Sequence, residues 1–108
     1  MTVDPDLIQS FLKPKSIAII GASADPQKTG SRIQRFLTSH QFKGKIFPVN
    51  PNRSEIFGLK CYSRLTEIKD KIDHIFIAVD GNKIIDAVQD AVSVNIKCAT
   101  ILSGGFAE

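Results

Sequence analysis

The chain has 108 residues, of which 43% are hydrophobic and 23% are charged. This composition is that of an ordinary globular domain, so it excludes a disordered, collagen-like or coiled-coil chain. The length fits one domain around one core and excludes a multidomain enzyme within these residues. Fourteen basic and eleven acidic residues give a net charge of +3, spread along the sequence without a run of like charges. That balance favours a small anionic ligand weakly and gives little reason to expect nucleic acid as a partner.

The sequence carries no signal for a membrane, for secretion or for a structural metal. No stretch has the roughly 18 to 20 consecutive apolar residues of a membrane span. Asp4-Pro5-Asp6 stands where a signal peptide would carry positive charge and then an apolar run. Cys61 and Cys98 are far apart and belong to no metal-binding motif. We therefore expect a cytoplasmic protein with free thiols, no metal site and no membrane partner.

The first half of the chain predicts two helices and two strands. Residues 4–12 begin with an Asp-Pro pair, typical of the first turn of a helix, and carry apolar side chains at helical spacing. Residues 16–20 (SIAII) are an uninterrupted apolar run, as expected of a strand that is covered on both faces. The apolar spacing over 31–39 predicts a helix. Residues 45–49 (KIFPV) predict a short strand, in which Pro48 requires an irregular end or a position where no amide hydrogen bond is needed.

The second half continues this alternation. Residues 56–62 (IFGLKCY) allow a brief strand or a turn, and 65–71 allow one short helix. Residues 73–79 predict a strand, 83–92 a helix with one apolar face, and 97–102 a last strand. Strands that alternate with helices predict an α/β domain of three layers, with a mainly parallel sheet and right-handed crossovers. Because no helix follows the last strand, we expect a domain cut at its C-terminal end from a longer protein.

Ligands of parallel sheets bind beyond the carboxyl ends of the strands, so four loops should converge on one crevice. These loops are residues 21–30, 50–53, 80–82 and 103–105. The first loop leads from a buried strand into a helix start, where free backbone amides, the helix dipole and Lys28 favour a phosphate. Gly21 and Gly30 are nine positions apart, so the loop is longer than the usual dinucleotide turn. The two glycines can also serve only a tight strand exit and a helix start.

The end of the second strand separates two classes of cofactor. An NAD site normally places Asp or Glu there to bind the ribose diol, but residues 50–53 read Asn-Pro-Asn-Arg. Arg53 offers a fork of donors that suits a phosphate on the ribose. Two cofactors carry such a phosphate, NADP on the 2′ oxygen and coenzyme A on the 3′ oxygen. A solvated surface arginine without a ligand is the third interpretation.

Four segments stand out in this order: SIAIIGASADPQKTG (16–30), GKIFPVNP (44–51), EIFGLKCY (55–62) and LSGGFAE (102–108). Together they resemble the N-terminal CoA-binding domain of NDP-forming (ADP-forming) acyl-CoA synthetases. More distantly, the sequence is similar to the alpha subunit of succinyl-CoA synthetase. The resemblance covers about residues 7–108 and implies a Rossmann-like fold that binds CoA across the strand ends.

The resemblance implies a CoA site built from four segments. Together with Lys28, its expected members are Gly21, Ala22, Ser23, Gly30, Val49, Asn50, Pro51, Arg53, Ala78, Val79, Ser103, Gly104 and Gly105. The first loop would hold phosphates, and the segment after the second strand would lie beside the nucleotide, with Arg53 where the alpha subunits have a basic residue. The third loop would follow the pantetheine arm, and the last turn would lie near its thiol. Asp80 departs from the family, which usually has proline there, and puts a negative charge near the path of an anionic ligand.

We therefore expect the chain to bind CoA or acyl-CoA, as a domain of an acid–thiol ligase that works with further domains or subunits. The resemblance implies that phosphoryl transfer through a histidine and the handling of ATP occur in later domains. His40 and His74 are expected to be structural or surface residues, and no catalytic constellation is present. The chain alone should therefore not catalyse the synthetase reaction. An NADP-binding fragment of an oxidoreductase is one alternative, and a non-enzymatic regulatory domain, which Asp80 favours, is another.

Overall fold

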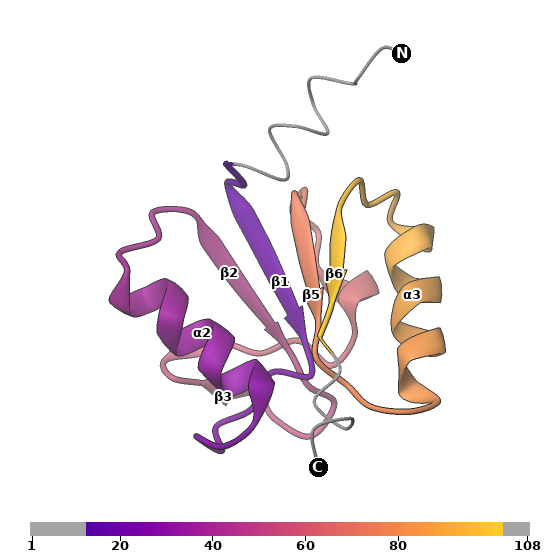
Figure 1. Ribbon diagram of the computed structural model, residues 1–108. Helices are drawn as coiled ribbons and strands as arrows, with labels where there is room; N and C mark the ends of the chain where they lie inside the picture. Colours follow the sequence, from indigo (N-terminus) through magenta and orange to yellow (C-terminus); the bar gives the residue numbers. More distant parts are fainter. Residues whose placement is uncertain (1–12, 103–108) are drawn as a thin grey trace.

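The computed structural model describes residues 13–102, so the helix expected over 4–12 lies outside the described residues. The elements are β1 (Ser16–Ile20), α2 (Thr29–Ser39), β2 (Lys45–Val49), β3 (Glu55–Ile56), β4 (Leu59–Lys60), the 3₁₀ turn η1 (Leu65–Glu67), β5 (His74–Ile77), α3 (Lys83–Ser93) and β6 (Ala99–Ile101). Four strands pair in parallel in the order β2-β1-β5-β6, and β3 and β4 form a separate antiparallel hairpin (Figure 1). The predicted α/β class with a parallel sheet is confirmed.

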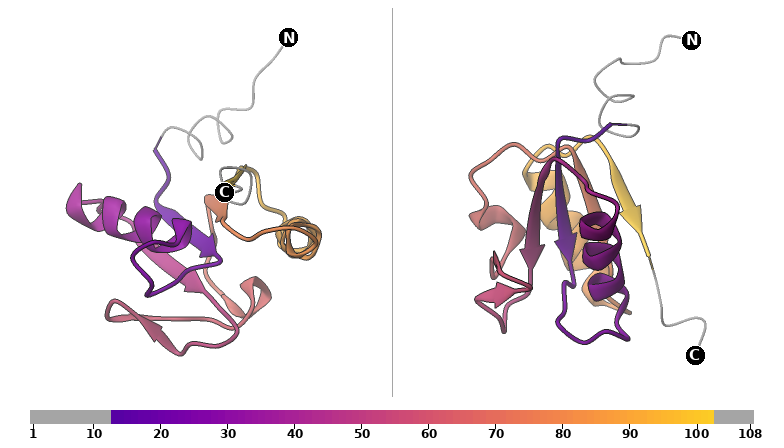
Figure 2. Two further views of the ribbon diagram at one scale, coloured as in Figure 1. Left: turned by 60° about the horizontal axis from the view of Figure 1, so that its bottom comes forward. Right: turned by 90° about the vertical axis from the view of Figure 1, so that its left-hand side faces the viewer.

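The sheet lies between α2 on one face and α3 with η1 on the other, which gives three layers in a Rossmann-like arrangement (Figure 2). Successive side chains of β1 point to opposite faces of the sheet. Ile17 and Ile19 belong to the cluster on the α2 side, whereas Ala18 belongs to the cluster on the α3 side. All three are at most 2% exposed, which explains the uninterrupted apolar run of this strand. The last strand is shorter than the predicted 97–102, and Ala99 and Ile101 on β6 are exposed, as expected of a strand that no helix of the described residues covers.

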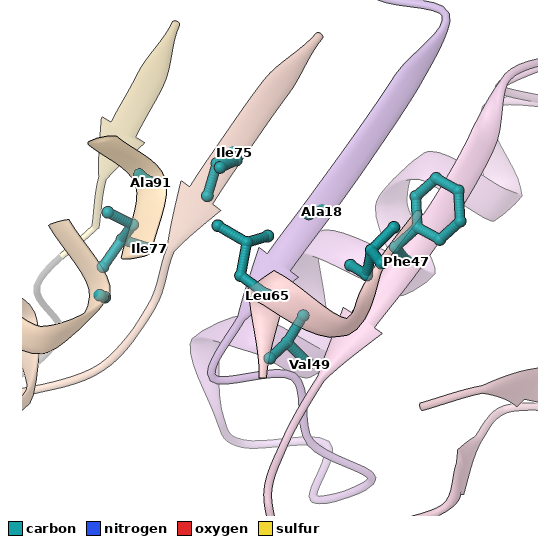
Figure 3. Packing of buried hydrophobic residues seen from close by; sticks show 9 residues of the cluster. Ala18, Phe47, Val49, Leu65, Ile75, Ile77 and Ala91 are labelled. Atoms are coloured by element: carbon teal, nitrogen blue, oxygen red, sulfur yellow. The ribbon is translucent and has the colours of Figure 1, made fainter. Parts of the chain in front are cut away.

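The core on the α3 side is closed by a single side chain from η1. Leu65 is 1% exposed and lies among Ala18, Val49 and Ile75 (Figure 3). Burial of one leucine side chain contributes about 1.5–3 kcal/mol, which is enough to anchor a turn of three residues. The helix expected over 65–71 is therefore limited to this turn, and the backbone is already extended at Ile68.

Residues 56–62, for which the sequence allowed either a strand or a turn, belong to the β3–β4 hairpin. Phe57 and Gly58 form its two-residue turn, both with positive φ (50° and 80°), as a type I′ turn requires. Ile56 is 1% exposed and packs on the α2 side. Gln34 of α2 donates from Nε2 to the Ile56 carbonyl oxygen at 3.2 Å, so the hairpin is tied to the helix.

Pro48 occupies a position where the sheet needs no amide hydrogen. Lys45 N–H donates to the Lys15 carbonyl (3.0 Å), and the Val49 carbonyl accepts from Gly21 N–H (3.1 Å), so both residues face β1. Pro48 lies between them in the alternation and faces the outer edge. Its carbonyl oxygen accepts there from Tyr62 N–H at 2.9 Å. The second of the two expectations for Pro48 is therefore the correct one.

Candidate binding site at the carboxyl edge of the sheet

Two glycines determine the shape of the loop after β1. Gly21 has φ +90°, and a Cβ at this position would overlap the carbonyl oxygen of Ala78. A Cβ on Gly30 would overlap the carbonyl oxygen of Gly21. The loop therefore packs directly against the loop after β5 and against the first turn of α2. Backbone packing is a sufficient reason for both glycines, so a binding role for this loop must rest on other residues.

Asn50 joins the loops after β1 and β2. Its Nδ2 donates to the Ala22 carbonyl at 2.8 Å, and its Oδ1 accepts from the Asn52 backbone N–H at 2.8 Å. The backbone N–H groups of Gly21 and Ala22 both donate to the Val49 carbonyl, at 3.1 and 3.2 Å. The ends of β1 and β2 thus form one hydrogen-bonded unit.

Two hollows open at this edge and share Gly21 and Asn50 as a common wall. The smaller, about 240 Å³, is lined by Gly21, Ala22, Ser23, Gln27, Lys28, Thr29, Asn50, Ala78 and Asp80. The larger, about 610 Å³, is also lined by Ile20, Val49, Leu65, Val79 and Ala87 and by the polar side chains of Asn52, Ser63, Arg64, Lys83, Asp86, Gln89 and Asp90, with Pro51 beside them. The two hollows therefore adjoin each other at the ends of β1, β2 and β5.

The structure brings most of the predicted site residues to these two hollows. Gly30 is the first exception, because it is buried where α2 packs on the loop after β1. Arg53 is the second: it is exposed and lines neither hollow. Ser103, Gly104 and Gly105 lie outside the described residues.

The smaller hollow faces the amino terminus of α2. No acidic residue lies in the first turn of this helix, and no side chain caps it. The partial positive charge of the helix end is therefore uncompensated, which favours an anion. Among the lining side chains, Lys28 is the one cation and Asp80 the one anion. An anionic group bound here would be attracted by the helix end and Lys28 and opposed by Asp80.

Arg64 and Lys83 line the larger hollow, although the sequence did not predict them as site residues. Arg64 precedes η1, and its Nη2 lies 2.7 Å from Asp90 Oδ1 on α3, so the pair connects two walls of the hollow. The hydrogen bond to Asp90 raises the pKa of the Arg64 guanidinium above its usual range. Lys83 is the first residue of α3, and within residues 13–102 no carboxylate lies within ion-pair distance of it. Lys83 directly follows the loop 80–82, which was predicted to line the crevice, so its position in the sequence could have identified it as a site residue.

The histidines and cysteines of the described chain offer no nucleophile at the hollows. His40 stacks on Phe36 at the end of α2, and buried His74 is 2.8 Å from the Thr100 hydroxyl. Cys61 is buried beside the Asn50 carbonyl, and its burial raises the pKa of the thiol. Residues 13–102 contain no group of three or more potential metal ligands. No helix within the same range is long and apolar enough to cross a membrane.

Comparison with known proteins gives consistent matches. The family described as CoA binding domain matches residues 15–108. The ADP-forming acetate–CoA ligase II of Archaeoglobus fulgidus is 42% identical over 104 residues, which are 96% of this chain and 15% of that ligase.

Solved structures agree with this match. The dinucleotide-forming acetyl-coenzyme A synthetase 1 of Ca. Korarchaeum cryptofilum, solved with phosphate and ADP, has a TM-score of 0.82 and 40% identity over 85% of this chain and 20% of its own. A conserved hypothetical protein of Pyrococcus furiosus has a TM-score of 0.74 and 34% identity over 82% of this chain and 74% of its own. The chain thus spans a minor part of the ligases that it matches.

Proposed function

The chain belongs to the family of CoA-binding domains, and from this membership we propose that it supplies the CoA site of an ADP-forming acyl-CoA ligase. Coenzyme A is the ligand of this family. The observation that carries the proposed site is the pair of hollows with a common wall at Gly21 and Asn50. Two adjoining compartments of unequal size suit a ligand in which a nucleoside is joined to a diphosphate.

We assign the diphosphate to the smaller hollow. The uncapped end of α2 directs backbone N–H groups toward it, and Lys28 adds a full positive charge. Ser23 lines the same hollow, and its Oγ accepts from the Asp25 backbone N–H at 2.9 Å, which holds the loop in shape. Asp80 lowers the affinity for the anion, so its replacement by the neutral amide in Asp80→Asn should tighten binding.

We assign the adenosine to the larger hollow, whose apolar floor can contact a base while its rim contacts a sugar. The volume, about 610 Å³, lies within the usual range of small-molecule sites. Two cations are candidates for the ribose 3′-phosphate. Arg53 is the candidate from the sequence, and it would have to reach the phosphate from outside the lining. Lys83 is the candidate from the structure, because it lines the hollow and Arg64 is already paired with Asp90.

The pantetheine arm would then leave along Ala78 and Val79, toward the segment that contains Ser103 and Gly104. In this proposal the chain binds and orients CoA, and the phosphoryl transfer and the handling of ATP belong to other domains or subunits. The free cysteines of residues 13–102 are compatible with the reducing cytoplasm, where we place the protein.

Calorimetric titration of the chain with CoA, NADP and NAD tests the proposal. We expect CoA to bind at least about tenfold more tightly than either dinucleotide, a difference of about 1.4 kcal/mol. Ser23→Phe, which fills the smaller hollow, should abolish binding. Thr66→Phe adds the same side chain at an exposed position outside both hollows and should not. NADP binding as tight as CoA binding would overturn the assignment.

A further inference from the structure

Lysines precede every strand of the parallel sheet. They are Lys13 and Lys15 before β1, Lys43 and Lys45 at the entry to β2, Lys69 and Lys71 before β5, and Lys97 before β6. Because the strands are parallel, their amino ends lie at one edge of the sheet. This edge is opposite the edge with the proposed CoA site. The topology therefore gathers charges that are scattered in the sequence.

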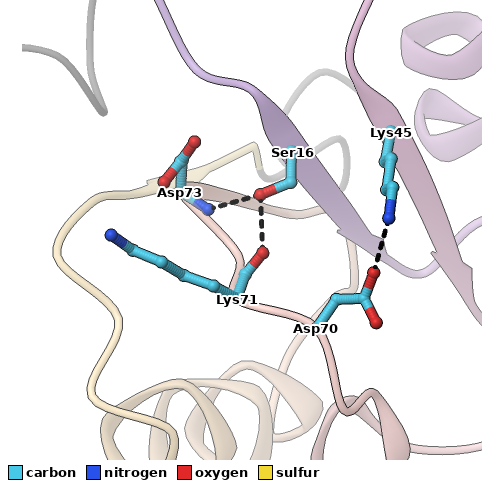
Figure 4. A network of polar contacts seen from close by, with 5 residues as sticks. All are labelled: Ser16, Lys45, Asp70, Lys71 and Asp73. Atoms are coloured by element: carbon cyan, nitrogen blue, oxygen red, sulfur yellow. Dashed lines mark hydrogen bonds and ion pairs between the residues drawn. The ribbon is translucent and has the colours of Figure 1, made fainter.

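Hydrogen bonds between side chains and backbone groups hold the loops before β1 and β5 together (Figure 4). Ser16 is 7% exposed, and its Oγ donates to the Lys71 carbonyl (2.8 Å) and accepts from Asp73 N–H (3.0 Å). Lys15 N–H donates to Asp73 Oδ2 at 2.7 Å. A Cβ on Gly44 would overlap the Lys15 carbonyl oxygen, so the loop into β2 contacts the loop into β1 directly. The fold thus fixes the backbone at Lys15 and Lys71 and brings the loop at Gly44 against it.

These loops surround a hollow of about 1070 Å³. Its basic lining residues are Lys13, Lys15, Lys43, Lys45 and Lys71, and we call this surface the lysine edge. Pro14 and Phe42 line it as well, and its acids are Asp70 and Asp73. Lys45 Nζ is 2.9 Å from Asp70, and Asp73 is engaged by a backbone amide. For the ammonium groups of the other four lysines, residues 13–102 provide no carboxylate within ion-pair distance.

We propose that the lysine edge binds an acidic segment of a partner protein, in which carboxylates alternate with apolar side chains. The carboxylates pair with the four uncompensated lysines, and the apolar side chains contact Phe42 and the aliphatic lysine stems. A peptide suits this site better than nucleic acid for two reasons. The lining contains no arginine, the residue best suited to phosphate, and Asp70 and Asp73 would repel an unbroken row of phosphates.

Fluorescence anisotropy with the full chain tests this proposal. The probe is a labelled eight-residue peptide, two repeats of Asp-Leu-Glu-Phe. We expect saturable binding that the double variant Lys13→Glu/Lys43→Glu weakens at least about tenfold. The control variant Arg32→Glu/Lys60→Glu makes the same change in net charge at exposed positions outside the lysine edge, and should change the affinity by less than about twofold. Saturating CoA should leave peptide binding unchanged, whether or not the proposed CoA site is correct.

Four results would overturn the proposal. The first is absence of saturable binding, and the second is an equal loss in the two double variants, which would indicate attraction by net charge only. The third is tighter binding of a twelve-nucleotide oligothymidylate than of the peptide, which would make the partner a nucleic acid. The fourth is a more than tenfold gain in peptide affinity in Asp4→Asn/Asp6→Asn, which would indicate that the acidic segment belongs to this chain.

Discussion

Replacement of Asn50 by alanine should destabilise the fold and the binding site together. The change removes two side-chain hydrogen bonds of 2.8 Å, one to the Ala22 carbonyl and one from Asn52 N–H. At about 0.5–1.5 kcal/mol for each bond, the expected loss is about 1–3 kcal/mol. For a domain of this size the melting temperature should fall by about 5–20 °C.

The measurement is thermal and urea denaturation of three variants beside the wild-type chain, followed by CoA titration well below the melting temperature. Asn52→Ala is the matched control, because only the backbone of Asn52 takes part in the contact, and it should change stability by less than about 0.5 kcal/mol. Asn50→Asp keeps the acceptor for Asn52 N–H but sets a carboxylate against the Ala22 carbonyl, so it should be no more stable than Asn50→Ala. An Asn50→Ala protein with wild-type stability and CoA affinity would refute the reasoning.

Three further predictions concern the same edge. Gly21→Ala should cost more than about 2 kcal/mol in urea denaturation, because its Cβ overlaps a carbonyl, whereas Gly81→Ala, with φ +58° and open space around it, should cost about 1 kcal/mol; equal costs would contradict the packing argument. Replacement by alanine of the residue that binds the ribose 3′-phosphate, Arg53 or Lys83, should weaken CoA about tenfold to hundredfold in calorimetry and leave dephospho-CoA unaffected. Equal losses of CoA and dephospho-CoA affinity, or no loss, in both variants would contradict both candidates. Burial raises the pKa of the Cys61 thiol above its ordinary value of 9.0, so the thiol contributes to stability below pH 9.0 and this contribution is lost as pH rises through the folded-state pKa. The difference in unfolding free energy between wild type and Cys61→Ala should therefore shrink above pH 9.0. A difference that stays constant with pH would exclude this linkage.

Local pattern was sufficient to predict the sheet and the convergence of its loops. Residues 17–20 of the run SIAII are all apolar because β1 is central and contacts both helical layers. The sequence of this strand alone therefore indicates that both of its faces are covered. The glycines at 21 and 30 also identified the first loop, although the structure explains them by backbone packing. The two hollows follow from the rule that ligands bind at the carboxyl ends of parallel strands.

The sequence could not predict contacts that depend on the path of the chain between strands. The β3–β4 turn contains Phe57 at positive φ, where Asn or Gly is typical, so Gly58 alone indicated a turn and the sequence left a strand and a turn equally open. Arg64 reaches the larger hollow because this hairpin and Leu65 determine where the chain returns to the sheet. The charge of +3 is spread evenly in sequence, but parallel strand order concentrates lysines at one edge. Composition alone contains no information on that arrangement.

The outward position of Pro48 has a consequence for association between chains. An edge strand can recruit a strand from another molecule only if successive outward N–H and C=O groups are available. On β2 the proline offers no N–H, and its carbonyl already accepts from Tyr62. Growth of the sheet by strand addition is therefore blocked on this side. Among the described strands, the other edge of the sheet is β6. Ile75 N–H donates to the Cys98 carbonyl and Leu102 N–H to the Ile77 carbonyl, so the N–H of Ile101 faces outward, and Ile101→Pro should hinder strand addition there.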